Sequence, residues 1–191
     1  MASCHACGLA QQRTLVVPGE GAEEAAILFI GEAPGFNEDQ QGRPFVGAAG
    51  AFLQELLHSI GLSREEVYIA NVVKCRPPGN RDPLPGEIAA CSPWLDRQIE
   101  LIGPKVIVTL GRHSLARYLP DEPISKVHGK VRRIGEVLCF PMYHPAAALH
   151  QGSLRGVIEQ DMQRLANVLK EMESAGPPGQ DSGSGSQLSL F

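Results

Sequence analysis

Apolar and polar residues form two kinds of segment along the chain. Short, almost wholly apolar runs, which are typical of buried strands, occupy residues 26–30, 67–73, 105–110 and 137–142. Longer segments with apolar residues every three or four positions, a spacing that predicts helices with one apolar face, occupy residues 48–60, 86–102 and 154–172. Strands that alternate with helices predict a three-layer α/β/α fold around a mostly parallel, four-stranded sheet.

Unusual residues follow three of the four predicted strands. Glu32 and Ala33 come after the first strand, a proline-rich loop begins at Lys74 after the second, and His144 follows the last. Ligands of open parallel sheets bind at the carboxyl ends of the strands. We therefore expect the functional site at this edge of the sheet.

Length and composition fit one domain of this class. The chain has 191 residues, of which 43% are hydrophobic and 20% charged, so it can bury a sizeable core. It has no apolar run of about 18 residues and no charged and apolar leader at the N-terminus, so we expect a soluble cytoplasmic protein without a membrane partner.

The formal net charge is −4, but acidic residues are concentrated near the two ends, and residues 27–170 carry slightly more basic than acidic side chains. Basic residues gather at 74–81 and at 126–133, where they either contact phosphates or are simply solvated. Charge therefore permits a nucleic-acid partner without requiring one.

Four of the five cysteines suggest a metal centre. Cys4 and Cys7 have the C-x₂-C spacing, Cys75 lies in the loop after a predicted strand, and Cys91 lies on the following predicted helix. Intracellular proteins rarely form disulfides, and four thiolates suit either zinc or an iron–sulfur cluster, between which the spacing does not choose. Cys139 lies within a predicted strand and is expected in the core.

Three segments together resemble the motifs of family 4 uracil-DNA glycosylases. They are Gly-Glu-Ala-Pro-Gly and its continuation over residues 31–47, Asn-Val-Val-Lys-Cys-Arg-Pro-Pro and its continuation over 71–81, and His-Pro-Ala-Ala at 144–147. The resemblance spans about residues 4–170 and implies the glycosylase fold over a domain of residues 1–173. It further implies a monomeric enzyme that flips uracil out of single- or double-stranded DNA, hydrolyses the N-glycosidic bond and leaves an abasic site for base excision repair. It also places the ligands of a structural [4Fe–4S] cluster at Cys4, Cys7, Cys75 and Cys91.

The same resemblance assigns residues to uracil binding. Phe45 would stack on the base, and backbone groups of Glu32 and Ala33 would touch it. The Asn71 carboxamide would donate to O4 and accept from N3–H, a pattern that cytosine reverses. The alternatives are an ordinary core aromatic at Phe45 and a strand-end amide without a ligand at Asn71.

Catalysis is assigned mainly to His144, which would donate to O2 of uracil and stabilise the leaving anion, in a protonation state that the sequence leaves open. Its alternative is an ordinary loop histidine. Glu38, with Glu32, would face the sugar cation and orient the attacking water, and Asn80 would support catalysis. Since residues 130–135 lack the histidine of a related covalent group, we expect simple turnover.

Contacts with DNA are expected from Arg76 and Arg81 in the proline-rich loop, and from Leu149 as a wedge into the duplex. Residues 174–186, rich in glycine, serine and proline, predict a flexible linker. It leads to a peptide at residues 187–191 that resembles the sliding-clamp ligands of bacterial repair proteins and implies a bacterial source. Its clamp-binding residues would be Gln187, Leu188, Leu190 and Phe191. A chance apolar ending or an artificial extension is the alternative.

Two rival functions remain beside the glycosylase. One is a non-catalytic binder of damaged DNA that recruits repair factors through the clamp. The other is a zinc-stabilised hydrolase of free nucleotides. The joint presence of Phe45, Asn71, Glu38 and His144 favours the enzyme over the binder.

Overall fold

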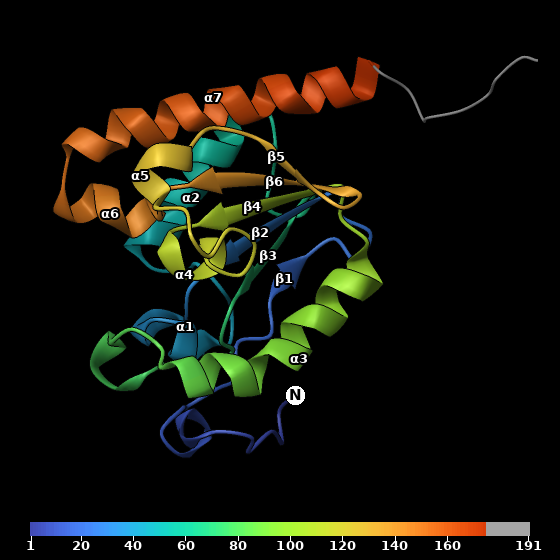
Figure 1. Ribbon diagram of the computed structural model, residues 1–191. Coiled ribbons are helices and arrows are strands. Elements are labelled where there is room, and N and C mark those ends of the chain that lie inside the picture. The colour runs from blue at the N-terminus through green and yellow to red at the C-terminus, as the bar shows by residue number, and fades with distance from the viewer. Residues whose placement is uncertain (175–191) are drawn as a thin grey trace, which may run out of the picture.

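The protein is described by a computed structural model over residues 1–174 (Figure 1). Apart from Ser174, which ends the last helix, the predicted linker lies outside the described residues. The predicted clamp-binding residues Gln187, Leu188, Leu190 and Phe191 also lie outside them. Among the described residues, no helix is both long enough and apolar enough to cross a membrane.

A six-stranded sheet runs through the centre of the protein in the order β1-β3-β2-β4-β6-β5. The four inner strands are parallel and are the four predicted from the sequence: β2 (Ile27–Gly31), β3 (Tyr68–Asn71), β4 (Val106–Leu110) and β6 (Val137–Met142). Two short antiparallel strands, β1 (Glu20–Gly21) and β5 (Arg132–Ile134), extend the sheet beyond the predicted four. Both are too short and too solvent-accessible to produce a hydrophobic pattern.

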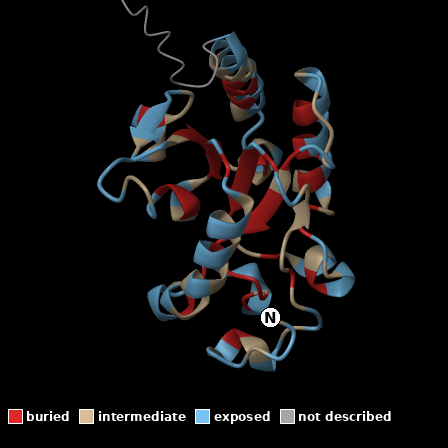
Figure 2. Cartoon of the chain, turned by 90° about the vertical axis from the view of Figure 1, so that its right-hand side faces the viewer, coloured by how far each residue is buried: buried red, intermediate tan, exposed pale blue. Residues whose placement is uncertain are grey.

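Helices cover both faces of the sheet, which confirms the predicted three-layer arrangement. The long helices are α2 (Ala48–Ser59) and α7 (Ser153–Ser174) on one face and α3 (Pro85–Ile102) on the other. Because successive strand residues point to opposite faces, Phe29 packs with the α2 and α7 side, whereas Leu28 packs with Leu95 of α3. Figure 2 shows buried strands between helices whose outer faces are exposed.

Each of the four parallel strands is followed within a few residues by a short helical element that the sequence pattern did not predict. In chain order these are α1 (Phe36–Gln41), the 3-10 turn η2 (Pro78–Asn80), α4 (Arg112–Leu115) and α6 (Pro145–His150). Two further short elements are η1 (Gly8–Gln11) and α5 (Ile124–Val127). Segments of three to six residues are too short for a helical period to be recognised. The elements after the strands build the carboxyl edge, where the predicted site residues lie.

Candidate active site

Two of the predicted base-binding residues meet at Gly31, the last residue of β2. Gly31 pairs in register with Asn71, the last residue of β3. A Cβ atom on Gly31 would lie 2.7 Å from Cζ of Phe45 and closer still to Oδ1 of Asn71. The Asn71 amide and the Phe45 ring therefore border the same small volume, which the glycine keeps open.

The Asn71 side chain has an unmet hydrogen-bonding capacity. Asn71 is 2% exposed, and its Oδ1 is buried without a hydrogen-bond partner among the described residues. Burying a polar oxygen without a partner costs free energy, so native structures keep few such atoms. This acceptor is suited to the N–H group of a ligand that enters beside Phe45.

Phe45 is held in a conformation that phenylalanine seldom adopts. Its φ of 54° lies in the left-handed region, and its side chain is buried. Arg64 fixes the backbone because Nη1 donates to the Phe45 carbonyl at 3.0 Å and Nη2 to the Pro44 carbonyl at 2.7 Å. Gly50 of α2 leaves room for this carbonyl, since a Cβ there would collide with it. The surroundings thus impose the orientation of the ring.

His144 stacks on Phe45, with ring centroids 5.5 Å apart and planes inclined by 24°. It caps α6, and its Nδ1 accepts the backbone N–H of Ala146 at 3.1 Å. Because Nδ1 is the acceptor, the ring proton of the neutral form sits on Nε2. Burial lowers the pKa of His144 to about 4, against the opposing charge of Glu38. At neutral pH the residue is therefore an uncharged Nε2–H donor.

Glu38 of α1 is anchored at the start of α2. Its Oε1 accepts the backbone N–H groups of Val46 and Gly47, both at 2.9 Å. These bonds fix the carboxylate near His144, whose pKa it raises against the effect of burial. The second oxygen, Oε2, has no hydrogen bond to another described residue and is available to a water molecule.

Asn80 and the two predicted DNA-contacting arginines lie on the loop after β3. Asn80 is exposed, with a φ of 55°, and its Oδ1 accepts Nε of Arg76 at 2.6 Å. The Arg76 guanidinium lies 5.1 Å from the ring centroid of Phe36, which is 55% exposed. Asn80 is thus linked to this surface rather than to the Asn71, Phe45 and His144 group.

Arg81 already has an ion-pair partner in the protein, whereas Leu149 is largely exposed to solvent. Arg81 donates to both carboxylate oxygens of Glu87, at 2.7 and 2.9 Å, so its charge is paired with the first turn of α3. Leu149 is 51% exposed on α6, five residues after His144. An exposed apolar side chain close to the catalytic candidate suits a wedge.

The four predicted metal ligands line one cavity together with Arg13 and Lys74, and these ligands are Cys4, Cys7, Cys75 and Cys91. Nη1 of Arg13 donates to Sγ of Cys75 at 3.1 Å, and the backbone N–H of Lys74 donates to Sγ of Cys91 at 3.3 Å. A hydrogen bond from the Ala6 backbone lowers the pKa of Cys4, whereas burial raises the pKa values of Cys75 and Cys91.

The spacing of these sulfur atoms bears on the metal. No three of the four lie within 4.8 Å of one another. Four Zn–S bonds in a tetrahedron would place the sulfurs about 3.8 Å apart. The cysteines are therefore spread more widely than a zinc site requires. Cys139 is buried in β6, outside this cavity, as expected for a core residue.

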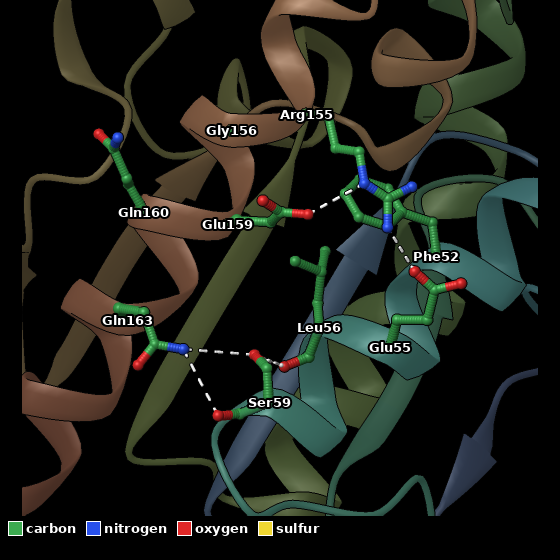
Figure 3. Close-up of a pocket in the computed structure, with 9 residues that line it drawn as sticks. All are labelled: Phe52, Glu55, Leu56, Ser59, Arg155, Gly156, Glu159, Gln160 and Gln163. Carbon is green, nitrogen blue, oxygen red and sulfur yellow. Dashed lines mark hydrogen bonds and ion pairs between the residues drawn. The ribbon is translucent and has the colours of Figure 1, made fainter.

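A groove of about 430 Å³ lies elsewhere, between α2 and α7 (Figure 3). Arg155 crosses it, bonded to Glu55 at 2.5 Å and Glu159 at 3.0 Å and stacked over Phe52. None of the predicted site residues lines it. The charged side chains of this groove pair with one another, so its size alone does not indicate a binding site.

Known proteins resemble this chain over most of its length. Residues 18–170 match the family model described as "Uracil DNA glycosylase superfamily". The chain belongs to this superfamily. The glycosylase is 53% identical over 177 residues to a type-4 uracil-DNA glycosylase of Sulfurisphaera tokodaii, covering 87% of this chain and 80% of the relative. Type-4 enzymes of Archaeoglobus fulgidus and Thermotoga maritima are 48% and 46% identical, over 87% and 88% of this chain and 88% and 90% of their own lengths. The predicted relationship to family 4 is thereby confirmed.

Several residues that shape the glycosylase site were not found from the sequence. His113 of α4 places Nε2 3.6 Å from Glu32 and 3.5 Å from Asp82, and so joins three loops at the carboxyl edge. Burial raises the pKa of Glu32, although the neighbouring His113 opposes this. Arg64, described above, was also missed. Each is a single residue outside the motifs' recognised positions, and only the fold shows what it touches.

Proposed function

We propose that this uracil-DNA glycosylase hydrolyses the bond between uracil and deoxyribose in DNA and leaves an abasic site for base excision repair. The observation that carries the proposal is the buried, unpartnered Oδ1 of Asn71, which borders Phe45 at Gly31. His144 stacks on the same Phe45 ring and offers a second polar contact. An acceptor, an aromatic face and a neutral donor are together what uracil recognition requires.

Recognition begins when the nucleotide is flipped out of the stack, because the base cannot reach a buried site inside a duplex. The Asn71 Oδ1 accepts N3–H of uracil, and the amide nitrogen donates to O4. Cytosine presents an acceptor at N3 and a donor at C4, so it would face both amide atoms with the wrong polarity. Phe45 supplies the aromatic face, and backbone groups of Glu32 and Ala33 border the base.

Bond cleavage places negative charge on the departing uracil and positive charge on the sugar. His144, neutral at pH 7 with its proton on Nε2, donates a hydrogen bond to O2 as the C1′–N1 bond breaks and its electron pair moves to the base. Glu38 uses Oε1 to hold Val46 and Gly47, which leaves Oε2 to orient the water that attacks C1′. The water's proton passes to the carboxylate, and the product is a free hydroxyl at C1′.

Glu32 and Asn80 have supporting parts. Glu32 is engaged with His113 at 3.6 Å, so we assign the water to Glu38 first. Asn80 acts through Arg76, to which it is bonded, and orders the loop after β3. In the same loop Arg76 and Arg81 would meet DNA phosphates, with Leu149 filling the gap left by the flipped nucleotide. Arg81 would exchange its Glu87 partner for a phosphate.

A [4Fe–4S] cluster held by Cys4, Cys7, Cys75 and Cys91 is part of the proposal. The four thiols line one cavity and are spaced more widely than zinc requires. Arg13 donates to the Cys75 sulfur and the Lys74 backbone N–H to the Cys91 sulfur. Such a cluster supplies a cross-link between the N-terminal segment and the loop that carries Arg76. Hydrolysis of an N-glycosidic bond transfers no electrons, so this part is structural.

The proposed partner outside the DNA is a sliding clamp, bound through Gln187, Leu188, Leu190 and Phe191. The support is the apolar terminal peptide after a stretch of glycine, serine and proline in the sequence. Removing residues 187–191 should abolish binding to a bacterial clamp and leave uracil release from free DNA unchanged. Clamp binding that survives the deletion would contradict this part.

The test of the whole proposal is uracil release from a labelled duplex with one U·G pair, read as an alkali-labile break. The parent should cleave, and Asn71→Ala and His144→Ala should each lose most activity. His150→Ala, at the exposed end of the same helix as the His144 cap, is the matched control and should cleave like the parent. Tight binding of uracil-containing DNA without release would instead favour the non-catalytic binder.

A further inference from the structure

Lys74 is a buried basic residue that the proposed mechanism does not use. The residue is 1% exposed and is among the largest fully buried side chains of the protein. It stands three residues after Asn71 and directly before Cys75. In sequence and in space it lies between the base-binding amide and the cysteine cavity.

Its contacts join these two places. The ammonium Nζ donates to the backbone carbonyl of Asn71 at 2.9 Å. Its backbone N–H donates to Sγ of Cys91, and Lys74 itself lines the cysteine cavity. One residue therefore touches both the strand end that carries the uracil-binding amide and a predicted metal ligand.

The Asn71 carbonyl, which Lys74 binds, lies at the end of a strand and needs a hydrogen-bond donor. Asn71 is the last residue of β3, and the chain leaves the regular ladder there, with Val72 and Val73 donating to the carbonyls of Gly31 and Glu32 at 3.1 Å. The Asn71 carbonyl finds its donor in the lysine. Because backbone and amide belong to one residue, a shift of this carbonyl displaces Oδ1 relative to Phe45.

The charge of Lys74 also needs a partner, because a buried ammonium is costly unless a negative group lies near it. Its one side-chain hydrogen bond among the described residues is to an uncharged carbonyl. Burial lowers the pKa of Lys74 to about 7; the nearby Cys91 sulfur opposes this shift and Arg117 adds to it. Thiolates in the cysteine cavity are thus the available counter-charge.

We propose that Lys74 is a positioning residue that couples the cysteine metal centre to uracil recognition. The backbone N–H of Lys74 bonds the Cys91 sulfur, and metal-bound thiolates in the cavity would stabilise the ammonium; the ammonium holds the Asn71 carbonyl, which sets the amide against the base. This inference rests on the proposed function and adds to it a role for the centre beyond bracing the DNA-binding loop.

The test separates recognition of the base from binding of DNA. Two duplexes serve as probes: one carries a 2′-fluoroarabino-uridine that resists cleavage, and the other a tetrahydrofuran abasic analogue. The ratio of their affinities reports the contact with uracil. Lys74→Met should lower the parent's preference for the uracil duplex about tenfold, as expected when a buried polar contact is lost, and change affinity for the abasic duplex less than about twofold.

The variants are chosen to control for folding and charge. Leu165→Ala, at a fully buried core position in α7, matches the loss of stability and should keep the parental ratio. Lys74→Gln replaces Lys74→Met if the latter does not fold. Lys74→Arg keeps the cation but changes the shape of its end, so it should retain iron like the parent while lowering the ratio.

Iron retention gives a second readout that does not depend on activity. Iron content and visible absorbance are followed in the presence of a chelator, and Lys74→Met should lose iron several-fold faster than Leu165→Ala. A folded, iron-loaded Lys74→Met with the parental ratio would overturn the inference. Equal losses for both duplexes would also overturn it, since they indicate a general structural role. A parent without preference for the uracil duplex would instead count against the proposed function.

Discussion

Replacing Gly31 with alanine adds a single methyl group where the proposed uracil site is most crowded. Gly31 has an ordinary strand backbone, so alanine introduces no conformational strain of its own. The new Cβ would lie 2.7 Å from Cζ of Phe45, which must retreat about 0.7 Å to reach ordinary contact at 3.4 Å. Asn71 Oδ1 is closer still and must move further.

Neither neighbour can yield freely. The Phe45 backbone is fixed by Arg64, and Asn71 is 2% exposed. Overpacking of this size costs about 1–3 kcal/mol of stability. A displacement approaching 1 Å of groups that orient a substrate costs on the order of 100-fold in rate. We expect Gly31→Ala to lower kcat/KM for uracil release about 100-fold in a protein that is still folded.

The assay is single-turnover release from the single-uracil duplex, with urea unfolding measured on the same samples. Gly156→Ala is the control, because a Cβ at this position in α7 would meet nothing within 4 Å. Activity of Gly31→Ala within about twofold of the parent would refute the assignment of the uracil site to the space between Asn71 and Phe45. So would a loss of activity that only follows unfolding.

Three further predictions concern titration, Phe45 and the last helix. Since the pKa of His144 is lowered to about 4, uracil release should persist as pH falls from 7 to 5, whereas an acid limb centred near 6.5 would show that the histidine titrates normally. As pH falls from about 6.5 to 4, His144 becomes protonated in the unfolded chain but stays neutral in the folded protein. Urea titrations should therefore show that its contribution to stability declines as pH falls through that range. Arg64→Met should cost about 1.5–3 kcal/mol in urea unfolding and lower activity through Phe45, while Arg43→Met, which meets only Glu20 at the surface, should cost less than about 1 kcal/mol. Gly156→Ala should raise stability by about 0.8–1 kcal/mol and leave uracil release unchanged.

The sequence was sufficient to predict the inner sheet and the three long helices. Strands β2 and β4 are buried at every position, so they appear as continuous apolar runs, and α2 and α7 are long enough for a helical period to emerge. It was not sufficient for β1, β5 and the short helices. Their formation depends on pairing and packing with distant segments, not on a local pattern.

Residues of the candidate site could be named from the sequence where a motif contains them, but not their surroundings where a distant neighbour determines these. Phe45, Asn71 and His144 could be named from the resemblance, but the left-handed backbone of Phe45 depends on Arg64, 19 residues away. His113 came to light only because the fold brings α4 beside Glu32. Long-range contacts of this kind have no counterpart in local composition.

His144 shows how the surroundings of a side chain change its chemistry. Had its ring been solvent-exposed, it would titrate near pH 6.5 and be partly cationic under mildly acidic conditions. The Ala146 N–H instead points at Nδ1, so a second proton there would place two donors against each other, and burial adds to the penalty. The fold therefore selects a neutral donor over an imidazolium. In the proposed mechanism, stabilisation of the uracil anion depends on a well-placed Nε2–H in a buried site, so the stacking of Phe45 on this ring becomes part of the catalytic apparatus.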